Sequence, residues 1–324
     1  MISVGIVGAT GYVAGELIRI ALHHPEMKID FLYSHSQPGK SVGEAHGDLF
    51  YSDLKFTSEL NPNVDVLFLC LGHGKSKAFL EQYPISQSTV IIDLSNDFRL
   101  NADAQFQGRS FTYGLVDARA DEIVSSKSIA NPGCFATAIQ LALLPIAAAG
   151  LLMDDVHVHA LTGSTGAGAG FSSTSHFSNR ANNVSLYKSF QHQHLGEIGE
   201  TLKSYQTDWN HRVNFLPMRG NFTRGIFASA YINTEEDAAT WLERYTEFYS
   251  HSPFTKVTTE PVHLKKVVNS NYALLQVEVV DGKLLITSVI DNLLKGAAGQ
   301  AVENMNLIFG LDQSAGLTYK TNVF

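Results

Sequence analysis

The stretch "GIVGATGYVAGEL", residues 5–17, runs from an apolar segment into residues with helical periodicity. Gly8 and Gly11 stand at the expected turn between strand and helix, and Gly15 follows one turn later. Missing side chains let the backbone approach a pyrophosphate, and a helix N-terminus supplies N–H groups and a positive dipole. The spacing differs from G-x-G-x-x-G, but its place in a strand–turn–helix unit favours a dinucleotide over a tight turn without a ligand. The residues expected to contact it are Gly8, Thr10, Gly11, Tyr12 and Val13.

The rest of the first third repeats this alternation of strand and helix. Apolar runs with strand character occupy residues 2–9, 27–34, 64–71 and 89–95, and a helical pattern covers 12–25. The runs are too apolar to alternate, as expected for strands covered on both faces. This half is therefore predicted to be a Rossmann-type, doubly wound parallel sheet.

After Gly150 the pattern changes. Strand-like stretches are expected at 155–161, 225–232, 272–280 and 283–290, with one helix at 235–250. Asp281 and Gly282 join the last two strands as a hairpin signal. We therefore predict an α/β protein whose second, α+β domain is built on a mainly antiparallel sheet. A helical stretch at 296–310 is expected to return to the first domain, which gives 1–133 plus 297–324 and 134–296 as the two domains.

The end of the second predicted strand discriminates between cofactors. An NAD enzyme usually places Asp or Glu there, but this chain reads "YSHSQPGKS" at 33–41. Asp30 is acidic but lies near the start of the strand. Ser34, Ser36 and Lys40 suit a 2′-phosphate, so NADP(H) is predicted.

Composition narrows the class of protein. The 324 residues carry a net charge of −8 without a run of Lys or Arg, which argues against nucleic acid or a membrane as partner. No apolar run has the length of a membrane span, and the first strand begins without a signal peptide. Two cysteines fit a reducing compartment, and a cytoplasmic location is expected.

One of these cysteines stands in "IANPGCFAT", residues 129–137, ahead of an apolar helical stretch that Gly150 closes. At a helix N-terminus the free N–H groups and the dipole favour a thiolate. Cys134 is thus a candidate nucleophile, and the alternative is a small buried apolar residue. Cys70, inside "VDVLFLCLG", is most simply a packed strand residue.

A second glycine-rich stretch, "LTGSTGAGAGFS" at 161–172, has the glycine spacing of a P-loop at Gly163 and Gly168. Ala169 stands where the lysine should be, so nucleoside triphosphate binding is not expected. The stretch either brings its backbone close to a cofactor ring or substrate, or is a flexible loop.

Several stretches together resemble one known family. "IANPGCFATAIQLALLP" at 129–145 is similar to the active-site signature of the N-acetyl-gamma-glutamyl-phosphate reductases, which are related to aspartate-semialdehyde dehydrogenase. Other stretches resemble the same family and follow one another in the family's order. They are "GATGYVAGEL" (8–17), "DLSNDFRL" (93–100), "HQHLGEI" (192–198), "GNFTRGI" (220–226) and "DNLLKGAAGQAVENMNL" (291–307).

The resemblance implies reduction of an acyl phosphate, N-acetyl-gamma-glutamyl phosphate, by NADPH through a thioester on Cys134, a step of arginine biosynthesis. It makes His192 the proton shuttle, with His194 as the rival. It also implies a homodimer or homotetramer, and no metal site is predicted. The remaining expected contacts are the departing phosphate at Arg99, the substrate α-carboxylate at Arg224, and the nicotinamide at Ser164, Gly166 and Asn292.

The spacing of Leu195, Ile198 and Leu202 favours a helix that begins at His194. His192 then lies in the preceding loop, free to face Cys134, and the two imidazoles diverge. Two alternative functions remain open at this point. One is a related reductase acting on N-acetyl-aminoadipyl, carrier-linked or aspartyl phosphate, and the other is a non-enzymatic NADP-sensing protein, against which an intact Cys134 counts.

Overall fold

Six strands of the N-terminal half form one parallel sheet in the order β2-β1-β3-β4-β8-β7. The structure, a computed structural model, describes residues 1–323. The strands are β1 (Ile2–Val7), β2 (Met27–Tyr33), β3 (Val66–Leu69), β4 (Val90–Asp93), β7 (Thr112–Tyr113) and β8 (Ser128–Ala130). Most of their side chains are buried, and the predicted doubly wound parallel sheet is confirmed.

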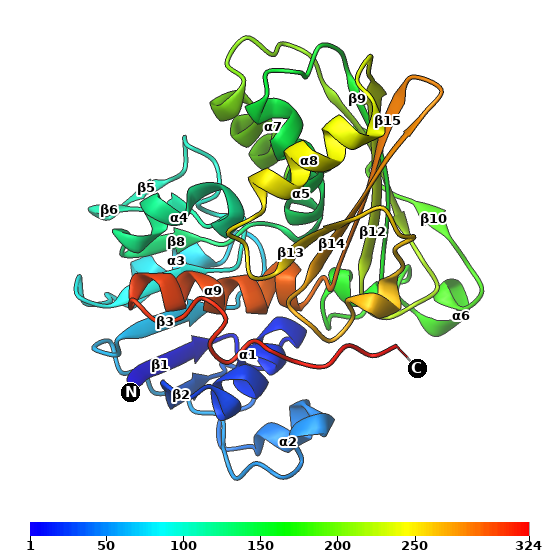
Figure 1. Cartoon of the computed structure of the whole chain (residues 1–324). Coiled ribbons are helices and arrows are strands. Elements are labelled where there is room, and N and C mark those ends of the chain that lie inside the picture. The colour runs from blue at the N-terminus through cyan, green and yellow to red at the C-terminus, as the bar shows by residue number, and fades with distance from the viewer. Residues whose placement is uncertain (324) are drawn as a thin grey trace. The chain divides into compact units, whose positions relative to one another are not determined.

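Helix α9 (Gly299–Ile308) packs against α1 (Tyr12–His23) and α4 (Val116–Val124), while α3 (Ser76–Gln82) joins β3 to β4 (Figure 1). The smaller elements are α2 (Val42–Ala45), η1 (Gly47–Leu49), β5 (Gln105–Phe106) and β6 (Arg109–Ser110). The chain leaves β1 through α1 to β2 on one side, and β3 lies on the other side. The carboxyl ends of β1 and β3 therefore flank the switch point, where doubly wound sheets bind their ligands.

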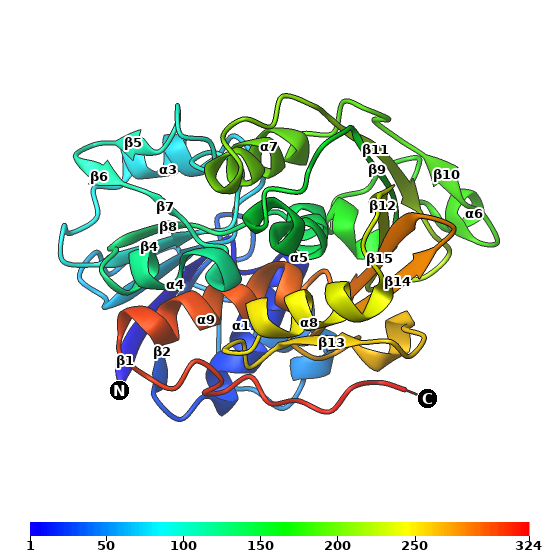
Figure 2. The ribbon, with the colours of Figure 1, turned by 45° about the horizontal axis from the view of Figure 1, so that its top comes forward.

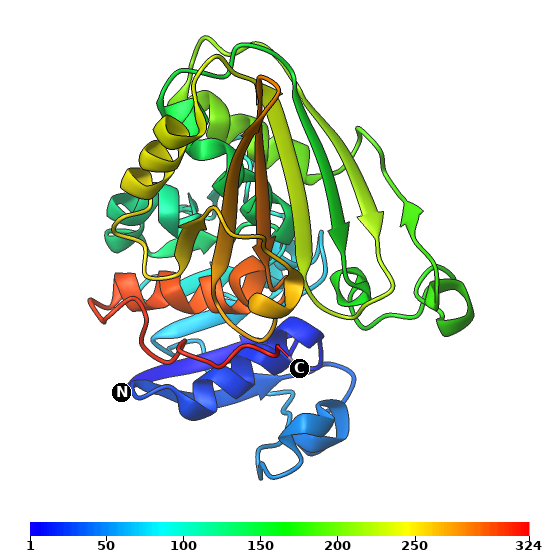
Figure 3. The same ribbon diagram turned by 45° about the vertical axis from the view of Figure 1, so that its right-hand side comes forward.

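The second sheet has seven strands in the order β10-β11-β9-β12-β15-β14-β13, and Figure 3 shows its long strands in green to orange. Its strands are β9 (Val156–Thr162), β10 (Ser185–Leu186), β11 (Val213–Arg219), β12 (Ile226–Asn233), β13 (Thr255–Thr258), β14 (Ala273–Val280) and β15 (Lys283–Ile290). The β11/β9 and β13/β14 pairs are parallel and the others antiparallel, so the predicted mainly antiparallel sheet is confirmed. The β14–β15 hairpin turns at Asp281 and Gly282, both at positive φ.

Helices α5 (Cys134–Ala148), α7 (His194–Tyr205) and α8 (Ala238–Phe248) cover one face of this sheet (Figure 2). Helix α5 is apolar all round and forms the centre of the core, as its composition predicts. The remaining short elements are η2 (Ser164–Ala167), α6 (Phe177–Arg180), η3 (Leu264–Lys266) and the π-helix η4 (Leu294–Ala298). On the opposite face, the outward side chains of β9 and β12 are exposed or half-buried.

The chain divides into two compact units. Unit 1 contains Met1–Gly133 and Ala297–Thr318, and unit 2 contains Cys134–Gly296 and the residues from Tyr319 on. The sequence analysis assigned 319–324 to the first domain instead. These last residues group with unit 2 because the backbone N–H of Asn322 donates to Val268 and the Asn269 amide donates to Lys320. Within residues 1–323, no helix has the length and apolar character of a membrane span.

Candidate active site

The turn after β1 is shaped by backbone alone. Gly8 has φ +75°, and a Cβ there would lie 2.7 Å from the carbonyl oxygen of Cys70, at the end of β3. The N–H groups of Gly8 and Ala9 both donate to the Tyr33 carbonyl at 3.1 Å. Helix α1 then begins at Tyr12 with no side-chain cap and no acidic residue in its first turn. Its first N–H groups are thus left for an anionic ligand.

His46 supports this turn from the side. Its Nε2 lies 2.8 Å from the Ala9 carbonyl oxygen, and the ring is buried. A Cβ on Gly15 would lie only 2.6 Å from Nδ1 of His46, so the ring occupies the space that a side chain at position 15 would need. Gly15 is therefore required for packing against a histidine as well as for the course of the helix.

The polar segment after β2 is where the sequence predicts a 2′-phosphate contact. Ser34 is buried, and its Oγ accepts from the Gln37 N–H at 3.2 Å, which makes a turn. Ser36 and Lys40 are exposed, and the Lys40 carbonyl accepts from the Phe56 N–H. The segment thus carries exposed donors on a backbone that is held in place at both ends.

A buried acid lies at the end of β4. Asp93 is fully buried and accepts hydrogen bonds from the Ser76 and Ser95 hydroxyls, both at 2.6 Å. Burial raises the pKa of Asp93 to about 6, although these bonds and the charge of Arg99 oppose the shift. Burial, and then the charge of Asp93, raise the pKa of the Cys70 thiol, which stays neutral. Cys70 is not an activated thiol.

Arg99 is held among backbone carbonyls of unit 1. Its Nε donates to Asn131 at 2.8 Å and one terminal nitrogen donates to Leu94 at 3.2 Å. The side chain is 7% exposed. Asp97, two residues earlier, accepts from the N–H groups of Gly74, Ser76 and Lys77 and so caps α3. The loop that carries Arg99 is thereby fixed to the end of the sheet.

Cys134 is the first residue of α5, as the sequence predicts, and its side chain is half-buried against the core of unit 2. Gly296, in the π-helix, lies directly beside it. A Cβ on Gly296 would be 2.9 Å from the Cβ of Cys134. The thiol is therefore placed by the start of a buried helix and by the close approach of a glycine from a distant part of the chain.

Histidine and aromatic rings pack around Phe135, the residue that follows this thiol. His192 lies in the loop before α7 and packs edge-on against Phe135 (centroids 5.5 Å), Tyr187 (5.8 Å) and His194 (4.5 Å). Helix α7 begins at His194, as predicted, and buries Ile198 and Leu202. The predicted divergence of the two imidazoles is wrong. Both are 5% exposed and in contact, because both pack against Phe135 on α5.

Hydrogen bonds distinguish the two histidines. The Nδ1 of His192 accepts from the backbone N–H of His194 at 3.3 Å, which leaves the proton of the neutral ring on Nε2. The Nε2 of His194 lies 3.8 Å from a carboxylate oxygen of the buried Glu197. Burial, and then the charge of Cys134, raise the pKa of the Tyr187 hydroxyl, so this phenol stays protonated.

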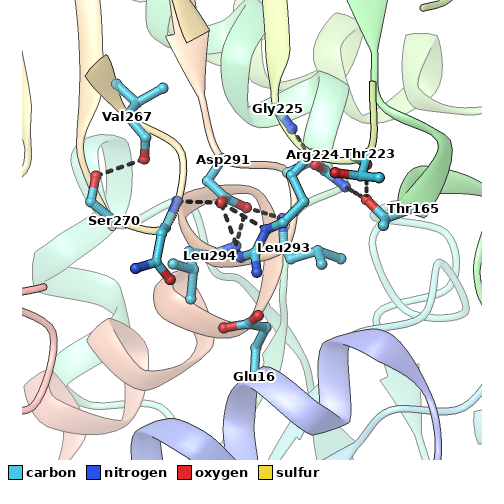
Figure 4. A network of polar contacts seen from close by, with 12 residues as sticks. Glu16, Thr165, Thr223, Arg224, Gly225, Val267, Ser270, Asp291, Leu293 and Leu294 are labelled. Carbon is cyan, nitrogen blue, oxygen red and sulfur yellow. Dashed lines mark hydrogen bonds and ion pairs between the residues drawn. The ribbon is translucent and has the colours of Figure 1, made fainter. Parts of the chain in front are cut away.

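A third cluster, shown in Figure 4, is organised by Asp291. One oxygen of this fully buried carboxylate accepts from Arg224 Nε at 3.1 Å and from the Asn269 N–H at 2.8 Å, and it forms an ion pair with Arg224 Nη2 at 3.0 Å. The other accepts from the N–H groups of Leu293 and Leu294, just before and within the π-helix. Arg224, predicted to hold a substrate carboxylate, thus already pairs with a protein carboxylate.

The glycine-rich loop after β9 joins the same cluster (Figure 4). The Thr165 hydroxyl donates to the Thr223 carbonyl at 2.6 Å and accepts from the side-chain NH2 of Asn292 at 3.0 Å. The side-chain oxygen of Asn292 in turn accepts from the Gly225 N–H at 2.7 Å. Ser164 donates its N–H to Phe222 at 2.9 Å. Of the predicted nicotinamide contacts, Ser164 and Asn292 therefore lie on one hydrogen-bonded network, and the exposed Gly166 follows on the loop.

Comparison with known proteins identifies the family to which the chain belongs. Residues 3–126 match the model of the semialdehyde dehydrogenase NAD binding domain, and 134–292 match that of the semialdehyde dehydrogenase dimerisation domain. Over the full length of both chains, it is 53% identical to N-acetyl-gamma-glutamyl-phosphate reductase from Flavobacterium johnsoniae, 54% to that from Christiangramia forsetii and 46% to that from Bacteroides thetaiotaomicron. The chain belongs to the N-acetyl-gamma-glutamyl-phosphate reductase family.

Solved structures of more distant proteins share the fold of this reductase family member. Aspartate semialdehyde dehydrogenase II from Vibrio cholerae, complexed with ASA, superposes with a TM-score of 0.72 at 16% identity, covering 96% of this chain and 98% of that one. Aspartate semialdehyde dehydrogenase with NADP from Candida albicans gives 0.67 at 15% identity, covering 95% and 98%. The fold prediction is confirmed, and the resemblance to the family is confirmed by the relatives.

Sequence reasoning did not find Tyr187, Asp291 or Gly296. Tyr187 lies in a polar stretch whose composition suggests an exposed loop. The only sequence feature that could have indicated its role is an aromatic residue five positions before His192. Asp291 and Gly296 lie in "DNLLKGAAGQA", which the resemblance includes but whose individual residues it did not assign beyond Asn292. Their roles depend on contacts with Arg224 and Cys134, which are far away in sequence.

Proposed function

We propose that this chain reduces N-acetyl-gamma-glutamyl phosphate with NADPH to N-acetylglutamate 5-semialdehyde and phosphate, in arginine biosynthesis. The observation that carries the proposal is a half-buried cysteine at the start of α5, followed by the Phe135 ring on which His192 packs, in a chain that matches reductases of this name over their full length. A non-enzymatic NADP sensor would have no use for a thiol placed in this way.

The residues of unit 1 fit a dinucleotide. Gly8 lets the turn lie close to the end of β3, where a Cβ would meet the Cys70 carbonyl, and α1 begins without a side-chain cap or an acidic residue. Gly8, Thr10, Gly11, Tyr12 and Val13 would hold the pyrophosphate, and Ser34, Ser36 and Lys40 the 2′-phosphate. NADPH, when bound, supplies the hydride.

In unit 2, Ser164, Gly166 and Asn292 would border the nicotinamide. The support for this assignment is the network that fixes their loop to Thr223, Gly225 and the segment after β15. A rigid loop holds a ring in one orientation, which hydride transfer requires.

The chemistry begins with the Cys134 thiolate. It attacks the carbonyl carbon of the acyl phosphate, the C–O bond to phosphate breaks, and a thioester forms. The first N–H groups of α5 stabilise the charge that develops on the carbonyl oxygen. Arg99, whose guanidinium is oriented by two backbone carbonyls, binds the departing phosphate.

The thioester is then reduced to a thiohemiacetal, which collapses to the aldehyde and regenerates the thiolate. As the hydride adds, the former carbonyl oxygen takes a proton from Nε2 of His192, and on collapse, when the C–S bond breaks, it returns that proton to the same nitrogen, because the His194 N–H occupies Nδ1. Phe135 and Tyr187 hold the imidazole from two sides. His194, paired with Glu197, holds this arrangement together from α7.

A homodimer or homotetramer is also proposed. The matching model of residues 134–292 describes a dimerisation domain. The outward face of the second sheet carries exposed and half-buried apolar and aromatic groups, among them Leu161, Phe227 and Tyr231, and His157 stacks on Tyr231 with centroids 5.3 Å apart. Sedimentation of the purified chain tests this assembly, and a monomer at micromolar concentration would exclude it.

The reverse reaction tests the function. Purified protein, phosphate and NADP⁺ are mixed with N-acetylglutamate 5-semialdehyde, and NADPH formation is followed by absorbance. The six-carbon aminoadipate homologue and aspartate semialdehyde are the comparison substrates. We expect the highest kcat/KM for N-acetylglutamate semialdehyde and no turnover without phosphate. A higher efficiency with either comparison aldehyde would replace the proposed substrate, and inactivity with all three would exclude the reaction.

A further inference from the structure

Strand β11 ends in an arginine that points into the core side of the second sheet. Phe215 and Pro217 are buried beneath α5 and α7, and Arg219 has the same strand parity. Its guanidinium carbon lies 4.8 Å from the centre of the Tyr187 ring. One terminal nitrogen donates to the Thr174 hydroxyl at 3.2 Å, and its Nε is buried without a hydrogen-bond partner.

A second arginine lies at the same end of the strand pair. Arg180 is 6% exposed, and both of its terminal nitrogens donate to the Ser185 hydroxyl at 3.3 Å. Its Nε is also buried without a partner. Ser185 pairs directly with Arg219 in the β10/β11 register, so the side chains of Ser185 and Arg219 lie on the same face of the sheet. Ser185 is the residue to which Arg180 donates.

Neither guanidinium has a carboxylate partner in the part of the chain that the structure describes. Across residues 1–323, no carboxylate lies within 4.0 Å of Arg180 or Arg219, although other arginines pair with acids, such as Arg224 with Asp291. The chain as a whole is acidic, with a net charge of −8. Arg180 is buried and Arg219 is half-buried, and a buried cation without a counterion is costly, so a bound anion would stabilise this pair.

This cationic site lies next to the reacting groups. Tyr187, on which Arg219 stacks, also contacts His192 edge-on. The anion site is thus separated from the catalytic histidine by about one aromatic ring. That spacing suits the carboxylate at the far end of a glutamyl side chain, whereas a phosphoryl group is attached to the reacting carbon itself.

We propose that Arg219, supported by Arg180, binds the α-carboxylate of the N-acylglutamyl substrate and so determines specificity. The assignment rests on the proposed function and replaces Arg224, whose fork is engaged by Asp291. Arg219 presents a planar fork that matches a carboxylate, stacked on a rigid ring. Tyr187 thereby links substrate recognition to the position of His192.

The test compares two aldehydes in the reverse reaction. N-acetylglutamate 5-semialdehyde carries the carboxylate, and 4-acetamidobutanal is the same chain without it. Arg219→Gln is expected to lower kcat/KM for the first by about tenfold to a hundredfold, mainly through KM, and to leave the second unchanged. The KM for phosphate should stay the same. Arg212→Gln, an exposed arginine just before β11, is the matched control and should change nothing.

Thermal melting and NADPH binding check that the variants are folded. If Arg219→Gln does not fold, Arg219→Lys serves instead, because it keeps the charge and loses the fork, and its smaller loss should still be confined to the carboxylate substrate. An equal loss for both aldehydes would overturn the assignment, as would a raised KM for phosphate. Wild-type protein that oxidises neither aldehyde would overturn the proposed function and this assignment with it.

Discussion

The turn after β1 and the surroundings of Cys134 hold their functional groups in opposite ways. The turn relies on backbone: Gly8 permits a close approach to β3, and α1 begins without a capping side chain. Cys134 is instead packed against side chains of its own unit, where His192 contacts both Phe135 and Tyr187. The first region is completed by its ligand, whereas the second is organised before any ligand binds. Changes in unit 1 should therefore affect cofactor binding, and changes around Cys134 should affect chemistry.

The strongest test of this contrast is Cys134→Ser. Reduction should be abolished, because a hydroxyl is not ionised at neutral pH, while NADPH affinity should be nearly unchanged. Turnover and fluorescence titration with NADPH measure the two quantities. Cys70→Ser is the control and should leave the chemical step intact, since burial keeps that thiol neutral. Substantial turnover by Cys134→Ala would refute covalent catalysis.

His192→Asn should lower kcat by about 10² to 10⁴, the usual contribution of a general acid–base group, and remove one limb of the pH–rate profile. His194→Asn should act mainly on KM, although the contact between the rings will transmit part of its effect to His192. Steady-state kinetics of both variants from pH 5.5 to 9 decide the matter. A larger kcat loss for His194→Asn would reverse the two roles.

Gly296→Ala tests whether the thiol is placed by packing. The new Cβ would lie 2.9 Å from that of Cys134, so one of the two must move. A displacement of about 1 Å costs on the order of a hundredfold in rate, so kcat should fall by about that factor while NADPH still binds. Gly199→Ala on α7 meets nothing within 4 Å and should be silent. Equal kcat values for the two variants would show that the sulfur is positioned otherwise.

In unit 1 the expected effect is on binding. Lys40→Met should raise the KM for NADPH roughly tenfold through the lost 2′-phosphate contact, and leave kcat and the KM for NADH unchanged. Lys28→Met removes an equally exposed lysine from the start of β2 and controls for net charge. Wild-type protein that uses NADH as efficiently as NADPH would contradict the cofactor assignment.

The smallest expected effect is on the pH dependence of thermal stability. Burial lowers the pKa of His24, whose Nδ1 accepts from the Glu26 N–H and whose Nε2 contacts Asn306, both at 3.1 Å. The folded state therefore favours the neutral ring. The stability that the neutral His24 ring contributes is complete above about pH 6.5, and it is lost as the pH falls toward the lowered pKa of the folded state. Between pH 7.5 and 5.5, wild-type Tm should fall relative to His24→Gln by on the order of 2 °C. Parallel Tm profiles would contradict this.

The parts of the site that could be predicted are those specified within one segment. Gly8 and Gly11 signal a turn between strand and helix, and Cys134 signals the start of an apolar helix; the structure has both. The contact between the two imidazoles was mispredicted because helical periodicity describes α7 alone and not the Phe135 ring packed across it. The pairing of Arg224 was equally inaccessible, since its partner is 67 residues away.

The contacts of Asp291 also bear on the order in which the site forms during folding. Its side chain joins Arg224, 67 residues earlier, and Asn269, 22 residues earlier, to the N–H groups that follow it. Closing contacts of such separation costs chain entropy, and the pairing of β12 with β15 brings together the strand ends next to Arg224 and Asp291. The N–H of Gly296 is held by the Asp291 carbonyl, so the close approach of Gly296 to Cys134 requires this segment to be in place. A nascent chain that has not yet synthesised β15 therefore carries Cys134 as an ordinary thiol, without the packing that places it for catalysis.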